Sequence, residues 1–524
     1  MNEKAQDLIF VIDAGTQSIR SSLIDLKGNI LHIVKTQIEP YFSKKPGWAE
    51  QEPAYYWKTL CDNCQKLLAD SEVSLESIKA VTLTTQRNTM INLDKKGEVL
   101  RPSIVWLDQR KASQEAWPPF YLKVALKMVK MYEPALHTYK ESEANWIRQN
   151  QPEIWEKTDK FLFLSGFFTY KLTGEYKDST GNIVGYVPFD YKNQVWAKDS
   201  DLKWQMFPMA KEMLPDLVKP SEILGHISLE ASKETHLPKG LPVIAAAADK
   251  ACEVLGAGCF SPEIGCLSYG TTATIETTNK KYVEVIPFFP PYPSAIPDYY
   301  NTEVMIYRGY WMVSWFKKEF GLREEQLAKQ KNMSPEALFD ELIKDIPPGS
   351  MGLTLQPYWS PGVKVPGPEA KGAIVGFGDV HTRAHIYRSI LEGLAYGLKE
   401  GLLKTEKRNK VKIEKLRVSG GGSQSRVAMQ LTADIFNLEA ERPHTYETSS
   451  LGAAINAAVG LKYFSDFEVA IKEMCHLKET FQPIKKNKEI YQNLFEKVYL
   501  KMYKKLKPIY DDIREITNYP PMDV

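Results

Sequence analysis

Residues 8–26 read LIFVIDAGTQSIRSSLIDL and are typical of a β-hairpin with a tight polar turn. An apolar run at residues 8–12 leads into DAGTQS at 13–18, and a second apolar pair follows at 23–24. Such a turn presents backbone N–H groups and small hydroxyls, which are the groups that bind a polyphosphate, and Asp13 at the strand end could hold its Mg²⁺. An ordinary glycine turn between two strands explains the same letters, so this pattern alone leaves both interpretations open.

A second stretch repeats this pattern in the other half of the chain. Residues 265–276, GCLSYGTTATIE, again give an apolar strand, a Gly-Thr turn and another apolar strand, without an aspartate at the matching point. A strand–turn–strand phosphate element that occurs once in each half predicts two related domains facing a shared nucleotide.

The composition narrows the class of protein. At 524 residues the chain is too long for one core, which favours two large domains. The balance of 67 basic against 65 acidic residues, net charge +2, argues against a dedicated nucleic-acid or membrane-surface binder. The polar start MNEKAQDLIF lacks the layout of a signal peptide, and the most apolar run, FLFLSGFF at 161–168, is too short to span a membrane. We therefore expect a cytoplasmic protein.

The six cysteines do not suggest a disulfide framework. Cys61 and Cys64 form a CxxC pair within a helical pattern, without a second ligand pair at zinc spacing, which favours a buried helix face over a metal site. The other four are expected to fill small gaps in the core: Cys252, Cys259, Cys266 and Cys475.

Hydrophobic periodicity predicts an alternation of strands and helices. Strands are expected at residues 30–38, 78–84, 90–93, 99–104, 241–248 and 416–419, and helices at 54–69, 309–320, 386–403, 429–436 and 489–506. Residues 117–175 are expected to be mainly helical, and the Pro-rich run 286–297 is interpreted as an irregular insertion without obvious chemistry. The small-residue helix at 451–458 suits close packing against the glycine loop at 420–422.

In order along the chain, several motifs resemble those of the FGGY carbohydrate kinase family, which includes glycerol kinase, xylulokinase, ribulokinase and gluconokinase. They run from about residue 8 to residue 460: IDAGTQSIRSSLID, GWAEQEPAYYW, TTQRNTMINLDKKGEVLRPSIVWLDQR, LTGE followed by DSTG, PVIAAAADKACEVLGAG, SYGTTA, KGAIVGF, SILEGLAYGL, LRVSGGGSQSR and SSLGAAINAAVG. The resemblance implies an α/β fold of two actin-like, ribonuclease-H-like domains flanking a catalytic cleft. The expected limits are 1–255 for the sugar-binding domain with the catalytic aspartate, 256–475 for the nucleotide-binding domain and 476–524 for a helical extension.

The chemistry that the resemblance implies is transfer of the γ-phosphoryl group of ATP to a hydroxyl of a sugar or polyol. Asp249 matches the general base, although a helix N-cap explains an aspartate there as well. Asp13 and Asp249 are assigned to Mg²⁺. The residues assigned to the nucleotide are Gly15, Thr16, Gln17, Arg20, Gly270, Thr271, Ser314, Gly421, Gly422 and Ser425.

The resemblance also implies an acceptor site. Its expected residues are Arg87, Asn88, Trp106, Asp108, Asp249 and Lys250. Arg87 matches a substrate-binding arginine of glycerol kinase, with a surface or inter-strand salt bridge as the alternative. Asn88 replaces a glutamate and Lys250 a glutamine of that enzyme, so local positive charge rises and a larger ketose or polyol, including one with an acidic group, is favoured. Lys250 could instead pair with Glu253.

Two other functional classes share some of these sequence features. An actin-like ATPase that acts as a chaperone or filament subunit would share the hairpins, but GWAEQEP, WLDQR and LTGE have no role in such assemblies. A catalytically silent sugar-binding relative is disfavoured because Asp13 and Asp249 are both present. The expected partner is a small-molecule sugar or polyol, with no nucleic acid or membrane, and a homodimer and a homotetramer both stay open.

Overall fold

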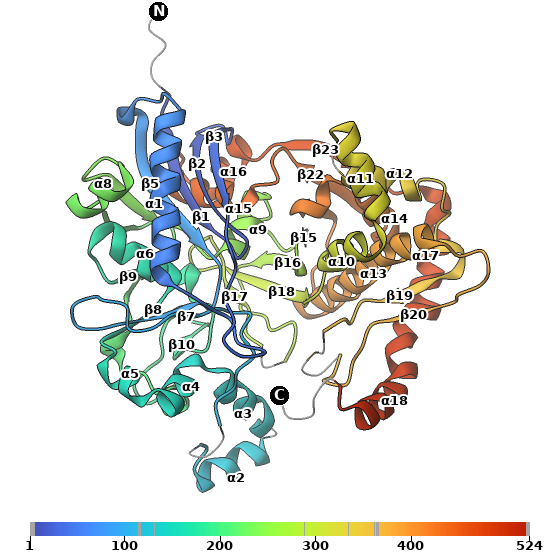
Figure 1. Ribbon diagram of the computed structural model, residues 1–524, viewed down its shortest axis with the longest axis horizontal. Helices are drawn as coiled ribbons and strands as arrows, with labels where there is room; N and C mark the ends of the chain where they lie inside the picture. Colours follow the sequence, from blue (N-terminus) through green and yellow to red (C-terminus); the bar gives the residue numbers. More distant parts are fainter. Residues whose placement is uncertain are drawn as a thin grey trace, which may run out of the picture.

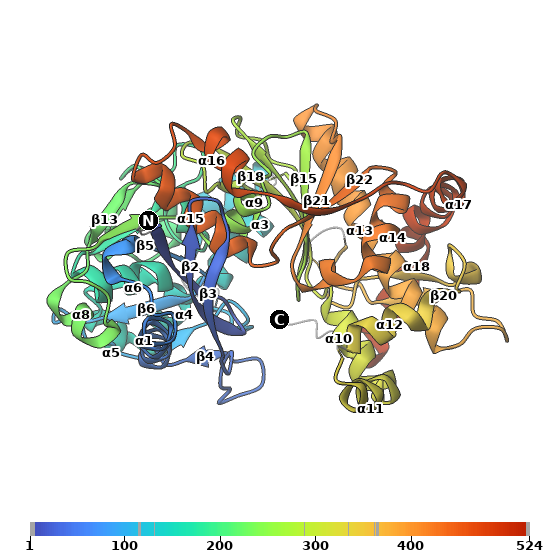
Figure 2. The same ribbon diagram turned by 90° about the horizontal axis from the view of Figure 1, so that it is seen from above.

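Two mixed β-sheets with matching strand topology form the framework of the chain (Figure 1). The computed structural model describes residues 6–113, 117–129, 131–287, 289–333, 335–360, 362 and 366–519. Seen from above, the sheets lie in two lobes, one mostly blue to green and the other mostly yellow to red (Figure 2). Each lobe has its own large cluster of buried apolar side chains.

The first sheet is built around the hairpin predicted at residues 8–26. Across the sheet its strands are β13 (Ile223–His226), β14 (Pro242–Ala245), β5 (Ile78–Thr85), β1 (Leu8–Ala14), β2 (Ser18–Asp25) and β3 (Ile30–Gln37). β1 runs antiparallel to β2 and parallel to β5. The side chains of β1 are buried along its whole length because helices cover both faces of the sheet, α1 (Pro53–Asp70) on one and α15 (Thr448–Gly460) on the other.

The second sheet repeats this topology. Its strands in order are β17 (Tyr292–Pro293), β18 (Tyr300–Ile306), β16 (Ala273–Asn279), β15 (Ile264–Tyr269), β21 (Lys415–Ser419), β22 (Glu439–Pro443) and β23 (Leu477–Phe481). The hairpin β15–β16 corresponds to β1–β2, and β21 follows in parallel as β5 does. The predicted duplication of the strand–turn–strand element is confirmed.

The small-residue helix α15 packs in a different place from the one expected. Its glycine and alanine side lies against α9 (Asp249–Gly256), where a Cβ on Gly452 would come within 1.9 Å of the Cys252 carbonyl oxygen. It also contacts β1 and β5, and Figure 2 shows it beside the first sheet. The prediction that this helix packs against the glycine loop is therefore wrong, because small residues specify close approach but not the partner. The domain limits at 255/256 and 475/476 stay a prediction.

A small four-stranded sheet lies beside the first sheet and contributes a wall of the site. Its strands are β4 (Glu50–Gln51), β7 (Ser103–Ile104), β6 (Met90–Leu93) and β8 (Lys160–Phe163). The expected strand at 99–104 is reduced to β7, with an isolated bridge at Val99. β8 interrupts the region predicted as mainly helical, which otherwise forms α2 (Phe120–Met128), α3 (Tyr132–Glu141), α4 (Glu143–Asn150), α5 (Pro152–Lys157) and α6 (Leu164–Thr173).

Other regions follow the sequence patterns closely. Cys61 and Cys64 lie buried in α1. The second lobe contains the predicted helices as α10 (Trp311–Phe320), α13 (Arg383–Asn409) and α14 (Arg426–Phe436), and the C-terminal packing helix as α17 (Lys485–Leu494) and α18 (Leu500–Thr517). None of the helices in the described ranges is long and apolar enough to cross a membrane.

Candidate active site

Asp13 stands at the end of β1, at the turn of the first hairpin, and is buried. Its Oδ2 accepts hydrogen bonds from the Arg20 guanidinium at 3.0 Å and from the Ser450 hydroxyl at 3.2 Å. Arg20, which was assigned to the nucleotide, also places its Nε 3.0 Å from Glu447. The turn itself is closed by the Gly15 N–H, which donates to the Ser18 carbonyl at 3.1 Å. Hydrogen bonds from Arg20 and from Ser450, which are far apart in the sequence, thus fix the orientation of the Asp13 carboxylate.

Asp249 is the first residue of α9, and Ala248 occupies the N-cap position. The N-cap alternative is therefore wrong by one residue. The Asp249 Oδ1 accepts a hydrogen bond from the Lys250 backbone N–H at 2.7 Å. Burial raises the pKa of Asp249 to about 6, against the opposing charges of Arg87 and Lys250 and with a smaller contribution from Asp13. This pKa lies closer to neutral pH than the pKa of a free aspartate, so the Asp249 carboxylate is suited to accept a proton.

Arg87 lies on the loop after β5, next to Asp249, and forms the salt bridge that was its alternative interpretation. Its Nη2 is 3.0 Å from the nearer carboxylate oxygen of Glu303 on β18. The Arg87 Cζ also lies 5.1 Å from the centre of the Tyr292 ring. Tyr292 belongs to the Pro-rich run 286–297, of which Phe288 falls outside the described residues, so this run does carry a contact to the site.

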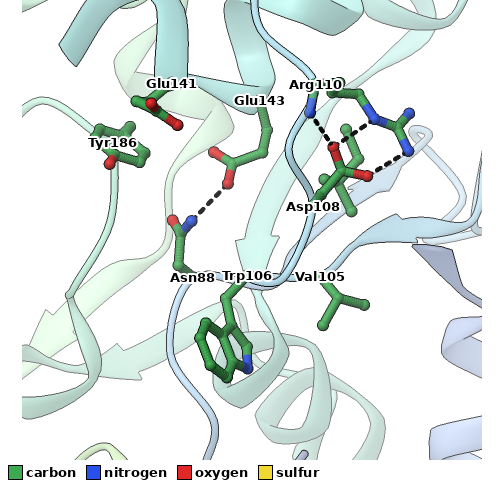
Figure 3. A pocket seen from close by; sticks show the side chains of 9 residues that line it. Asn88, Val105, Trp106, Asp108, Arg110, Glu141, Glu143 and Tyr186 are labelled. Atoms are coloured by element: carbon green, nitrogen blue, oxygen red, sulfur yellow. Dashed lines mark hydrogen bonds and ion pairs between the residues drawn. The ribbon is translucent and has the colours of Figure 1, made fainter. Parts of the chain in front are cut away.

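Asn88 follows Arg87 with a φ of 48°, in the left-handed region. Asparagine tolerates this conformation better than most residues with a side chain, which gives a local reason for its presence at the turn. The cavity next to Asn88 has a volume of about 90 Å³ and is lined by Asn88, Ile104, Val105, Trp106, Asp108, Arg110, Glu141, Glu143 and Tyr186 (Figure 3).

The polar residues of this cavity are mutually connected. The Asn88 amide donates to Glu143 at 2.6 Å, and burial raises the pKa of Glu143 to about 8, so its carboxyl is mainly protonated at neutral pH. Asp108 accepts from Arg110 and from the Ala49 N–H at 2.6 Å each. The Trp106 indole N–H donates to the Thr16 hydroxyl at 2.9 Å, which links the cavity to the first hairpin turn.

The Lys250 ammonium is held by an ion pair and a hydrogen bond and is not left free to bind an acceptor. Its Nζ lies 2.7 Å from Glu253 and 2.5 Å from the Ser268 hydroxyl, and Ser419 also donates to Glu253. The Glu253 carboxylate raises the pKa of Lys250 despite burial, so the ion pair stays charged. Pairing with Glu253, the alternative that the sequence left open, is what the structure contains. The extra positive charge on which the acidic-acceptor hypothesis rested is therefore neutralised.

The second hairpin and the glycine loop lie side by side in the second lobe, because β15 pairs with β21. Gly270 and Thr271 accept backbone N–H groups from the start of α10. A Cβ on Gly421 would meet nothing within 4 Å, whereas one on Gly422 would lie 2.3 Å from the Tyr310 ring. The surface above Gly421 is thus open, and Gly422 provides close approach of the backbone to an aromatic ring.

Ser425 and Ser314 were both assigned to the nucleotide, but in the structure one caps a helix and the other is exposed on a helix. Ser425 caps the N-terminus of α14 and donates to Asp340 at 2.5 Å. Ser314 is exposed on α10. Their assignments stay predictions.

Among the side chains of the site that sequence reasoning missed are Glu143, Tyr292 and Glu303. Each lies far along the chain from its partner and has no motif of its own. Glu303 follows Asn301 and Thr302 in β18, so its polarity does not stand out from its neighbours in the sequence.

The donor set of the site fits a magnesium ion carried by phosphates. The described part of the chain contains no group of three or more potential metal-ligating side chains. Asp13 and Asp249 come from different elements and lie near enough for the charge of Asp13 to affect the pKa of Asp249. Mg²⁺ usually takes one or two carboxylates and completes its shell with water and substrate phosphates, which matches this pair.

Comparisons with known proteins cover nearly the whole chain. The family models described as "FGGY family of carbohydrate kinases", N-terminal and C-terminal domain, match residues 8–256 and 265–461. The "Uncharacterized sugar kinase YgcE" of Escherichia coli (strain K12) is 32% identical over 92% of this chain and 90% of its own length. A xylulose kinase of Staphylococcus epidermidis (strain ATCC 12228 / FDA PCI 1200) is 28% identical over 98% and 100%. The crystal structure of a xylulose kinase from Rhodospirillum rubrum superposes with a TM-score of 0.80 at 22% identity, over 96% of this chain and 100% of that one, and shows the same fold.

Proposed function

This chain belongs to the FGGY family of carbohydrate kinases and is therefore a phosphotransferase of two actin-like domains, and we propose that it transfers the γ-phosphoryl group of ATP to a hydroxyl of a neutral ketose or polyol, with Asp249 as general base. The observation that carries this proposal is the position of Asp249. It lies at the start of α9, beside Arg87 from the loop after β5, with a pKa raised to about 6.

In the proposed reaction, the Asp249 carboxylate accepts the proton of the acceptor hydroxyl while that oxygen attacks the γ-phosphorus. The bond to the β,γ-bridging oxygen breaks and ADP leaves with the electron pair. Arg87 would bind and orient the acceptor beside Asp249. The two hairpin turns would place backbone N–H groups against the phosphates, and such positioning supplies much of the rate in phosphoryl transfer.

Asp13, together with Asp249, would hold the magnesium ion of the nucleotide. When bound, the ion would neutralise charge on the phosphate oxygens. Arg20 and Ser450 fix the Asp13 carboxylate by hydrogen bonds to Oδ2. Gly421, with open space above its backbone, is proposed to face the adenosine.

A neutral acceptor is supported by the pairing of three cations at or near the proposed acceptor site. Arg87 pairs with Glu303, and Lys250 pairs with Glu253. Arg110 is shared between Asp108 and Glu50. Since each of these three cations already has a carboxylate partner, none offers an uncompensated charge to a sugar acid. The name of the relative from S. epidermidis, xylulose kinase, is consistent with a ketose.

The test is an assay of acceptor-dependent ADP release with glycerol, erythritol, D-xylulose, D-ribulose and gluconate. We expect turnover with a neutral ketose or polyol and little with gluconate. Preference for gluconate would contradict the neutral acceptor. ADP release that ignores every acceptor and rises with a protein client would favour the actin-like ATPase.

A further inference from the structure

One ion pair near the site joins the two lobes. Arg87 follows β5 of the first sheet, whereas Glu303 lies on β18 of the second sheet. The Arg87 Nη2 lies 3.3 Å and 3.0 Å from the two carboxylate oxygens of Glu303. The side chains are 17% and 6% exposed, so little water competes for this contact.

Glu303 is the carboxylate that contacts the Arg87 guanidinium directly. Glu276 is the cross-strand neighbour of Glu303 in the β16–β18 register. Burial and the nearby Glu303 raise the pKa of Glu276 well above its usual range, and Glu276 Oε1 accepts from Thr274 at 2.9 Å. The Tyr292 ring covers the guanidinium on another side. Arg87 is thus confined by side chains of the second lobe.

A guanidinium carries five N–H donors in a fixed plane, so holding one nitrogen restricts the direction of the others. We infer that Glu303 is a positioning residue for the acceptor: it holds Arg87 from the opposite lobe, so the acceptor site is complete only when the lobes lie as they do here. This inference rests on the proposed function, since it assigns to Arg87 a contact with the acceptor.

The experiment compares acceptor KM, ATP KM and kcat for the wild type, E303Q, E303D, R87M and the double variant R87M/E303Q, with the best neutral acceptor of the panel above. The control is E324Q, which removes one charge from the Arg383–Glu324 pair, 2.6 Å long, in the same lobe. Melting curves establish that each variant is folded. E303D keeps the negative charge, so it tests whether this conservative substitution restores the acceptor KM.

We expect E303Q to raise the acceptor KM about ten-fold, as for a lost hydrogen bond to a charged group, with the ATP KM within two-fold of the wild type. E303D should recover part of this loss. In the R87M background, E303Q should change the acceptor KM by less than two-fold, because the residue that it positions is already missing. E324Q should leave the acceptor KM unchanged.

An acceptor KM that is unchanged or lower in E303Q would overturn the inference. So would equal losses in the wild-type and R87M backgrounds, which would indicate a structural role only. A wild-type protein without turnover on any acceptor would instead overturn the proposed function, and this inference with it, so the two failures can be told apart.

Discussion

The Asn88 amide donates a 2.6 Å hydrogen bond to Glu143, which joins the loop after β5 to the first residue of α4 across the small cavity (Figure 3). This bond holds a left-handed residue next to Arg87 in place. Its acceptor is a buried carboxyl, and this burial raises the pKa of Glu143 to about 8. The wall of the proposed acceptor site therefore contains a group that changes charge just above neutral pH.

Stability should depend on pH through Glu143. Its pKa is about 8 in the folded protein against an ordinary 4.5, so between these values the folded state binds more protons than the unfolded state. The free energy of unfolding should then fall as pH rises from about 5 to 8, by at most about 1.4 kcal/mol per pH unit from this group. Urea unfolding of the wild type and E143Q from pH 5 to 9 should show a shallower slope in E143Q. The exposed variant E175Q should keep the wild-type slope, and identical slopes in all three would contradict the assignment.

Substitution of the proposed base should separate chemistry from binding. D249N should lower kcat by about 10²–10⁴-fold, because an amide cannot accept the proton, while nucleotide binding without Mg²⁺ stays near the wild-type level. Single-turnover phosphoryl transfer and ADP titration measure the two effects. D178N is the matched control, since Asp178 is also a buried aspartate with a pKa raised by burial to about 6, bonded to Ser165 and Asn182. A D249N enzyme with wild-type kcat would exclude Asp249 as the base.

The indole of Trp106 should matter through a single hydrogen bond. W106F removes the 2.9 Å bond to Thr16 and keeps an aromatic ring in the cavity wall. Loss of a neutral hydrogen bond predicts a fall in kcat/KM of about two- to ten-fold. W196F removes a similar indole bond, to the Pro215 carbonyl at 2.9 Å, and should leave kcat/KM unchanged. Equal effects in the two variants would indicate that the bond to Thr16 has no special role.

Two neighbouring glycines should respond differently to alanine. In G422A the new methyl group meets the Tyr310 ring at 2.3 Å, so we expect a loss of about 1–3 kcal/mol in stability. In G421A it enters open space, so stability should stay within about 0.5 kcal/mol of the wild type while the KM for ATP rises. Thermal unfolding and ATP titration of both variants measure these effects. A G421A enzyme with unchanged ATP KM would place the nucleotide elsewhere.

Local patterns in the sequence were sufficient for the framework of the fold. The two Gly-Thr hairpins, the buried CxxC helix and the long helix α13 follow from periodicity and turn chemistry within short windows. The short strand β8 was missed because its three apolar residues, Phe161, Leu162 and Phe163, continue directly into the apolar helix α6. Within such a run, periodicity cannot distinguish a strand from a buried helix.

Partners that are distant in the sequence could not be predicted. Lys250 and Glu253 lie within one helical turn, so their pair was foreseen as an alternative. Arg87 and Glu303 are separated by 216 positions, and neither segment contains a pattern that predicts the other as its partner. The same holds for α15, whose small residues predicted close packing but not the helix α9 against which they pack.

The course of the chain through α15 has a consequence for its synthesis. After β22 in the second sheet, the chain returns to the first lobe as α15 and α16 (Phe467–Met474) and then enters the second sheet again as β23. Strand β1 receives α15, the helix that covers one face of its sheet, only after residue 460 has left the ribosome. Neither lobe can therefore be completed by an N-terminal fragment, and we expect separately expressed halves to expose the apolar faces that α15 covers and to aggregate.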